Sequence, residues 1–169
     1  ADDDADFNRR LYLARKQFER SQLPGYIASI SASTIVYKAL CAGRMLADFY
    51  PDLADPRFKT PFALFHQRYA TNVLPSWERA QPLRTLAHNG EINTVWGNRA
   101  RMDARAATMP LELHPVLSED GSDSTSLVAI VEMLAPTGRT VGEAVRMPLP
   151  PASPGHTPAF FPVRGAWLA

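Results

Sequence analysis

The nine residues LAHNGEINT (86–94) place an Asn-Gly corner between an apolar stretch and a segment with helical periodicity. Asn and Gly both tolerate the positive φ values of tight turns, so this dipeptide predicts a turn at Asn89 and Gly90. The expected local structure is therefore a strand over 83–88, a corner, and a helix over 91–107. The same corner could bind an anion, because the Asn89 side-chain amide and the Gly90 backbone N–H can donate to one negatively charged oxygen. A plain turn and an anion hole both stay open on these residues alone.

Patterns of apolar residues predict further helices and strands along the chain. Residues 6–20 have apolar side chains at helical spacing, which predicts an amphipathic helix that ends before Pro24-Gly25. A short helix is expected over 40–50, and a capped helix over 120–134 with Ser122 or Asp123 at its N-cap. The β-branched run 26–38 and the apolar run 61–72 predict strands. The chain therefore mixes helices and strands.

Composition and charge exclude several classes of protein. The chain has 169 residues, 46% of them hydrophobic and 21% charged, which suits one globular domain. The formal net charge is only +1, and the arginines of 79–105 alternate with acidic residues, so we expect no nucleic-acid binding. No apolar run is long enough to cross a bilayer, and the acidic start ADDDAD is unlike a signal peptide. We expect a soluble, cytoplasmic protein with no membrane partner.

The cysteine and histidine residues predict no metal site. Cys41 is the single cysteine, which excludes an intrachain disulfide and a cysteine-rich zinc or iron–sulfur site in this segment. Because Cys41 lies in an apolar stretch with helical periodicity, we interpret it as a buried structural thiol. The four histidines lack the i, i+4 spacing of zinc-binding helices.

Two charged residues could bind opposite ends of a small zwitterionic substrate. Arg68 follows an apolar run and could hold a carboxylate through two hydrogen bonds, or form a structural ion pair. Asp123 could hold an ammonium group, or simply cap the helix that follows. Ser122 and Ser124 are poor candidates for a nucleophile, because no Gly-x-Ser-x-Gly motif surrounds them. His66 is interpreted as a packed histidine.

The last stretch of the chain differs from the rest. Six prolines fall within residues 148–162, and neither a helical nor a strand period is present there. We expect residues 148–169 to form an irregular, Pro-rich tail, and residues 1–147 to form the domain.

A long part of the chain resembles a known enzyme family. The segment FHQRYATNVLPSWERAQPLRTLAHNGEINTVWGNRARMDAR (65–105) resembles the class II glutamine amidotransferase domain of glutamate synthases. The insert PSWERAQP and the continuation NGEINTVWGNR look like glutamate synthases in particular. STIVYKAL and DFYPDLADPRF upstream, and SEDGSDSTSLVAIVEML downstream, support this choice, and the resemblance covers residues 7–147.

The resemblance implies a fold and a set of roles. The fold would be α+β, an incomplete four-layer αββα N-terminal-nucleophile (Ntn) hydrolase fold. Arg68 would hold the glutamine α-carboxylate and Asp123 the α-ammonium group. Asn89 and Gly90 would form the oxyanion hole, so that the turn and the anion site become one feature. Thr71 and His88 fall in the matching motifs and would line or support the pocket.

The resemblance also implies cofactors, partners and alternatives. A glutamate synthase would hydrolyse L-glutamine and pass ammonia to 2-oxoglutarate, with FMN and an iron–sulfur cluster outside this segment. Its partners would be the remaining synthase domains and a small subunit or ferredoxin. Two alternatives are another class II amidotransferase, which the PSWERAQP insert disfavours, and a non-catalytic glutamine-binding or scaffold module.

One departure from the family concerns the nucleophile. The family uses an N-terminal cysteine whose α-amine acts as the base, whereas residue 1 here is Ala1. We expect the 169-residue chain by itself to release no ammonia from glutamine. Ammonia release above a buffer blank that Asn89→Ala abolishes would contradict this expectation.

Overall fold

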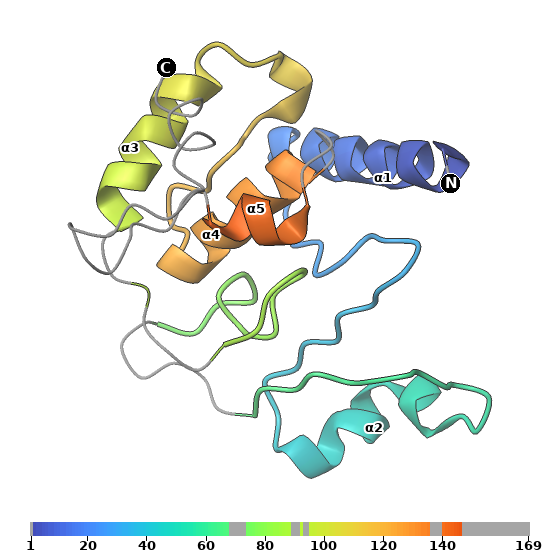
Figure 1. Ribbon diagram of the computed structural model, residues 1–169. Coiled ribbons are helices and arrows are strands. Elements are labelled where there is room, and N and C mark those ends of the chain that lie inside the picture. The colour runs from blue at the N-terminus through green and yellow to red at the C-terminus, as the bar shows by residue number, and fades with distance from the viewer. Residues whose placement is uncertain (1, 68–73, 89–91, 93–94, 136–139, 147–169) are drawn as a thin grey trace, which may run out of the picture. The chain divides into compact units, whose positions relative to one another are not determined.

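The computed structural model describes residues 2–67, 74–88, 92, 95–135 and 140–146. The chain divides into two compact units, residues 1–90 and residues 91–169, and each unit is described by itself (Figure 1). Helices and loops make up the described residues of both units. None of the helices in these ranges is both long and apolar enough to cross a lipid bilayer.

The first unit opens with the long helix α1 (Asp2–Arg20), which confirms the helix predicted over 6–20 and extends it toward the N-terminus. The acidic residues of its first turns stabilise the positive end of the helix dipole, and Arg20 lies in the last turn. The helix closes where the Ser21 backbone N–H donates to the Gln17 oxygen at 3.1 Å. Gln22 then takes a φ of 53°, in the left-handed region that often follows a helix.

The buried face of α1 differs from the apolar face that the sequence predicts. Phe7 is 51% exposed, whereas Arg15 and Lys16 are 3% and 4% exposed. Both cations pair with the Glu19 carboxylate, at 3.1 Å from Arg15 and 2.8 Å from Lys16, and both lie over the Tyr12 ring. A carboxylate and an aromatic face compensate the lost hydration of the two charges, so burial of these residues is tolerated.

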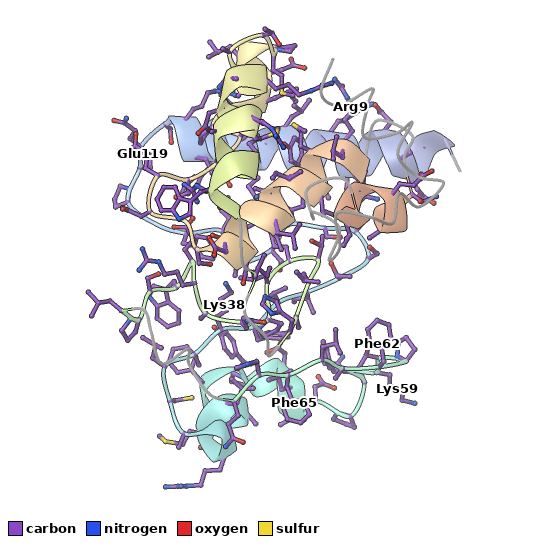
Figure 2. The ribbon with its side chains drawn as sticks, turned by 60° about the vertical axis from the view of Figure 1, so that its left-hand side comes forward. Arg9, Lys38, Lys59, Phe62, Phe65 and Glu119 are labelled. Carbon is purple, nitrogen blue, oxygen red and sulfur yellow. The ribbon has the colours of Figure 1, made fainter. Side chains whose placement is uncertain are left out.

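The strands predicted over 26–38, 61–72 and 83–88 are absent from the described residues of these segments. Phe62 and Phe65, labelled in Figure 2, are 70% and 86% exposed. These apolar side chains are therefore largely uncovered by the other described residues. A strand is defined by backbone hydrogen bonds to a neighbouring strand. In these segments, backbone groups donate to other partners. The Val36 N–H, for example, donates to the Ser29 hydroxyl at 2.9 Å.

Short helices and an aromatic cluster organise residues 37–58. The helix predicted over 40–50 is confirmed in part, as the 3-10 turn η1 (Gly43–Met45) and the helix α2 (Leu46–Phe49), and η2 (Pro51–Ala54) follows. The Tyr37 ring contacts the rings of Tyr50 and Phe58, with centroids 4.8 Å and 6.2 Å away. The Tyr37 hydroxyl also donates to the Asp52 carboxylate, which ties the start of this segment to η2.

The second unit is built around one helix. Its elements are α3 (Val95–Ala106), η3 (Leu111–Leu113), α4 (Asp123–Leu134) and α5 (Val141–Arg146). Both α3 and α4 confirm helices predicted from the sequence. Helix α4 packs against α3 and α5, and most of its residues are buried. Its core side chains include Ile130, Val128 and Leu134, all at most 2% exposed, with Met102 of α3 and Ala144 of α5 at 0%.

Helix α5 was not predicted, although its start carries a recognisable signal. The Thr140 hydroxyl accepts the Glu143 N–H at 3.3 Å, and the Glu143 carboxylate accepts the Thr140 N–H at 2.9 Å. This reciprocal pair is a capping box, which satisfies two backbone donors that a helix start leaves open. The Thr-x-x-Glu spacing could have located the start of α5 from the sequence.

Candidate functional site

The structure describes two of the six residues that the resemblance assigns to the site. Arg68, Thr71, Asn89 and Gly90 lie outside the described residues, so their roles stay predictions. His88 belongs to the first unit and Asp123 to the second, and each is described within its own unit.

Asp123 is the first residue of α4, and its side chain is exposed. The alternative that Asp123 caps the helix is wrong, because the cap is Ser122, whose hydroxyl accepts the Thr125 N–H at 3.2 Å. Within the described parts of the chain, the Asp123 carboxylate makes no hydrogen bond or ion pair. Asp123 therefore lies exposed at the first position of a helix that its neighbour Ser122 caps.

Arg99 of α3 holds the loop that leads into α4. Its Nη1 donates to the Gly121 oxygen at 3.0 Å and to the Ser126 hydroxyl at 2.6 Å. Its Nη2 donates to the Ser118 oxygen at 3.0 Å and to the Glu119 oxygen at 3.4 Å. Sequence patterns assigned no role to Arg99. The available signal was its position in the predicted helix over 91–107, on the same side as the apolar residues Ile92 and Met102.

His88 ends a short closed loop in the first unit. Its backbone N–H donates to the Gln81 side-chain oxygen at 2.9 Å, and the Leu83 N–H donates to the Leu86 oxygen at 2.9 Å. These two bonds close residues 81–88 into a compact turn in place of the predicted strand. The backbone immediately before Asn89 is therefore held by contacts inside its own loop.

A cationic cluster ties this loop to residues 26–38. Lys38, labelled in Figure 2, is 6% exposed, and its Nζ donates to the Trp77 oxygen at 2.9 Å. Its Nζ lies 4.7 Å from the centroid of the Tyr26 ring, and Arg84 donates to the Tyr26 hydroxyl at 3.1 Å. Burial, and then the nearby Arg84 charge, lower the pKa of Lys38 to about 8, while the Glu78 carboxylate opposes this shift. Sequence patterning did not indicate this cluster, since its members are up to 58 residues apart.

The lowered pKa of Lys38 predicts how stability depends on pH. Between pH 8 and the unfolded lysine pKa of 10.5, the unfolded chain binds more protons than the folded chain, so stability rises with pH. We expect a gain of about 1–2 kcal/mol from pH 7.5 to 9.5, less than the full shift would give because this window covers only part of the range between the folded and unfolded pKa values. The range stops at 9.5 because the hydrogen bond to Asp52 raises the pKa of Tyr37 from 10.0 to about 12, which destabilises the fold above pH 10.

Urea unfolding of the chain and of Lys38→Met at both pH values measures this effect. The variant should lose the gain between pH 7.5 and 9.5, because methionine fills a similar volume and has no proton to release. Lys59→Met is the control, since Lys59 lies on an exposed segment and should leave the pH dependence unchanged. Equal pH dependence in the parent chain and Lys38→Met would contradict the prediction.

The remaining nucleophile and metal candidates do not form a site in the described residues. Cys41 is exposed and precedes η1, so the interpretation of a buried structural thiol is wrong. The apolar stretch around it starts its helix only at Gly43, which leaves Cys41 in a bend outside the helix. In the same described ranges, His, Cys, Asp and Glu side chains form no group of three that could hold a metal ion.

Comparison with known proteins identifies the family. The family model described as "Glutamine amidotransferases class-II" matches residues 1–159. The chain belongs to the class-II glutamine amidotransferases. Membership in this family implies an Ntn hydrolase fold, and the match extends past Met147, where the visible resemblance ended.

Glutamate synthases are among the proteins similar to this chain. The chain is 40% identical over 165 residues to the ferredoxin-dependent glutamate synthase, chloroplastic, of Oryza sativa subsp. japonica, covering 89% of this chain and 10% of that protein. It is 42% identical over 162 residues to the glutamate synthase [NADPH] large chain of Azospirillum brasilense, covering 88% and 11%. It is 42% identical over 160 residues to the corresponding large chain of Bacillus subtilis, covering 88% and 10%. The chain thus spans about a tenth of the length of these relatives.

Proposed function

We propose that this chain is part of the glutaminase domain of a glutamate synthase. The complete enzyme would hydrolyse L-glutamine and pass the released ammonia to 2-oxoglutarate, which yields glutamate. The observation that carries the proposal is the identity of about two residues in five along most of the chain to synthases from a plant and two bacteria. All three relatives are named glutamate synthases, and this favours a glutamate synthase over other class II amidotransferases.

The proposed pocket binds the two charged ends of glutamine with opposite charges. Arg68 holds the α-carboxylate through paired N–H donors, and Asp123 receives the α-ammonium group. The exposed Asp123 carboxylate, with its helix already capped by Ser122, supports this role. Thr71 and His88 line or support the pocket, and the bonds that close residues 81–88 support His88 as an anchor of the loop.

The proposed chemistry needs a polarised amide and a stabilised oxyanion. When a nucleophile attacks the glutamine side-chain carbonyl, its oxygen becomes negatively charged in the tetrahedral intermediate. The Asn89 side-chain amide and the Gly90 N–H donate to this oxygen and stabilise it more strongly than the neutral carbonyl of the substrate. Because these donors are already oriented before the reaction, they lower the activation barrier of amide hydrolysis without any rearrangement of the protein.

The wider proposal concerns the fold, cofactors and partners. The finer fold is the four-layer αββα arrangement, incomplete in this segment, with a domain over 1–147 and an irregular tail over 148–169. FMN and an iron–sulfur cluster would serve the complete enzyme, in the cytoplasm, together with a small subunit or ferredoxin. The single Cys41 does not fit an iron–sulfur cluster, which takes several cysteine ligands, so the cluster must lie outside this segment.

Calorimetric titration of the 169-residue chain with L-glutamine tests the proposed pocket. We expect binding that Arg68→Ala weakens about tenfold or more, because a hydrogen bond to a charged group is worth about 1.5–3 kcal/mol. Arg101→Ala is the matched control, since Arg101 is an exposed residue of α3. An equal affinity for glutamine in Arg68→Ala and the parent chain would refute the role of Arg68.

A further inference from the structure

Arg99 of α3 donates hydrogen bonds to neutral acceptors only, within the described residues. It is partly buried, and its guanidinium donates to three backbone oxygens and one hydroxyl. Within the described residues it forms no ion pair with a carboxylate. The planar guanidinium presents five donors in fixed directions, so such a set of neutral acceptors suits the holding of a backbone shape.

The backbone that Arg99 holds is the loop between η3 and α4. Two acceptors, the oxygens of Ser118 and Gly121, belong to residues on either side of a turn that the Gly121 N–H closes at 3.2 Å. A third acceptor, Ser126, lies in the first turn of α4 and donates in turn to the Ser122 oxygen at 2.9 Å. One guanidinium group therefore ties both the loop and the helix start to α3.

The loop is closely packed around Gly121. A Cβ atom added to Gly121 would lie 2.9 Å from the Thr125 hydroxyl and 3.2 Å from the Ser118 oxygen. Ser126 is 2% exposed, so its hydroxyl has no access to water as a substitute partner for Arg99. Loss of the guanidinium would remove a donor from the buried Ser126 hydroxyl and from the part-buried oxygens of Ser118 and Gly121, close to Asp123.

We infer that Arg99 is a positioning residue for ligand binding: by holding residues 118–122 and the first turn of α4, it sets the direction in which Asp123 presents its carboxylate. This inference rests on the proposed function, in which Asp123 receives the α-ammonium group of glutamine. Arg99 itself touches no ligand in this arrangement. It determines selectivity for ligands that carry an α-ammonium group.

Comparing two ligands shows whether Arg99 positions Asp123 or has only a general structural effect. L-glutamine carries the α-ammonium group, and glutaramic acid is the same molecule without it. Calorimetric titration of the 169-residue chain should show that Arg99→Gln weakens L-glutamine binding about tenfold, the worth of one hydrogen bond to a charged group. Its affinity for glutaramic acid should stay unchanged, because that ligand gives Asp123 nothing to bind.

Variants and outcomes complete the test. Arg101→Gln makes the same chemical change two residues further along α3 and should alter neither affinity. Arg99→Lys should recover part of the glutamine affinity, since an ammonium group can replace one or two of the donors. If Arg99→Gln does not fold, as judged by circular dichroism, Ser126→Ala replaces it, because this variant removes one acceptor of Arg99. Ser126→Ala should also weaken binding of L-glutamine and not of glutaramic acid, by a smaller factor.

The failures of the two proposals are distinguishable. If the parent chain does not bind glutamine, or if Asp123→Asn leaves glutamine binding unchanged, the proposed function fails and this inference with it. If Asp123→Asn weakens glutamine binding but Arg99→Gln does not, Arg99 is no positioning residue. Equal losses for glutamine and glutaramic acid in Arg99→Gln would show a general structural role and overturn the inference alone.

Discussion

Replacing Asn89 with alanine is expected to lower kcat for glutamine hydrolysis about 10²- to 10³-fold, the usual effect of removing one oxyanion donor. The Asn89 amide donates to an oxygen that is negatively charged only in the transition state and the intermediate. KM for glutamine should therefore change little, because the ground-state amide oxygen gains much less from the same donor. Steady-state ammonia release by the complete synthase that we propose carries this segment measures both constants.

Two controls make this result specific. Asn8→Ala makes the same substitution on α1, where the Asn8 amide donates to the Asp4 oxygen on the surface, and should leave kcat unchanged. Formation of glutamate from 2-oxoglutarate and added ammonium should persist in Asn89→Ala, since that step needs no glutamine. A variant that raises KM and leaves kcat intact would assign Asn89 to substrate binding and remove it from the oxyanion hole.

Replacing Ile130 with alanine is expected to cost about 2–5 kcal/mol, the range for truncating a large aliphatic side chain in a core. Ile130 is 1% exposed and lies on α4, the helix that packs against both α3 and α5. The deleted atoms would leave a cavity that the neighbouring helices fill only in part. Hydrogen exchange of the α4 amides, followed by mass spectrometry, should become faster by about 30-fold or more if opening of the helix sets the rate.

The matched control for this prediction is Ile35→Ala in the first unit. Ile35 is 59% exposed, and truncation of an exposed residue away from special features changes stability by about 0.5 kcal/mol or less. The exchange rates of the α4 amides should therefore stay the same in Ile35→Ala. Equal exchange in Ile130→Ala and the parent chain would contradict the central position of α4 in its unit.

Helices were predicted from the sequence more successfully than strands. The predictions for α1, α3 and α4 succeeded because a helix satisfies its backbone within four residues, so its signals are local. The Ser122 cap is one such signal, and the structure decided between Ser122 and Asp123. The β-branched run 26–38 has the composition of a strand, but a strand needs a neighbour, and composition does not supply one.

Burial was predicted less well than helix formation. The apolar positions of α1 were expected to face inward, yet its most buried residues are Arg15 and Lys16. Trp96 of α3 is 84% exposed although it is a large apolar side chain on the same helix as Met102, which is 0% exposed. Helical spacing identifies which residues share a face, but the partners available to that face decide whether it is buried.

The sequence by itself indicated the family, proposed the candidate residues of the pocket and predicted the helices α1, α3 and α4. A motif such as His-Asn-Gly-Glu and a cap such as Ser-x-x-Thr act between residues that are near one another along the chain. Only the tertiary structure decided that Arg99 holds a loop 19–27 residues away, and that Lys38 is buried beside Trp77, 39 residues away. Contacts between such distant residues depend on how the chain folds back on itself, and the periodicity of a short segment carries no record of that path.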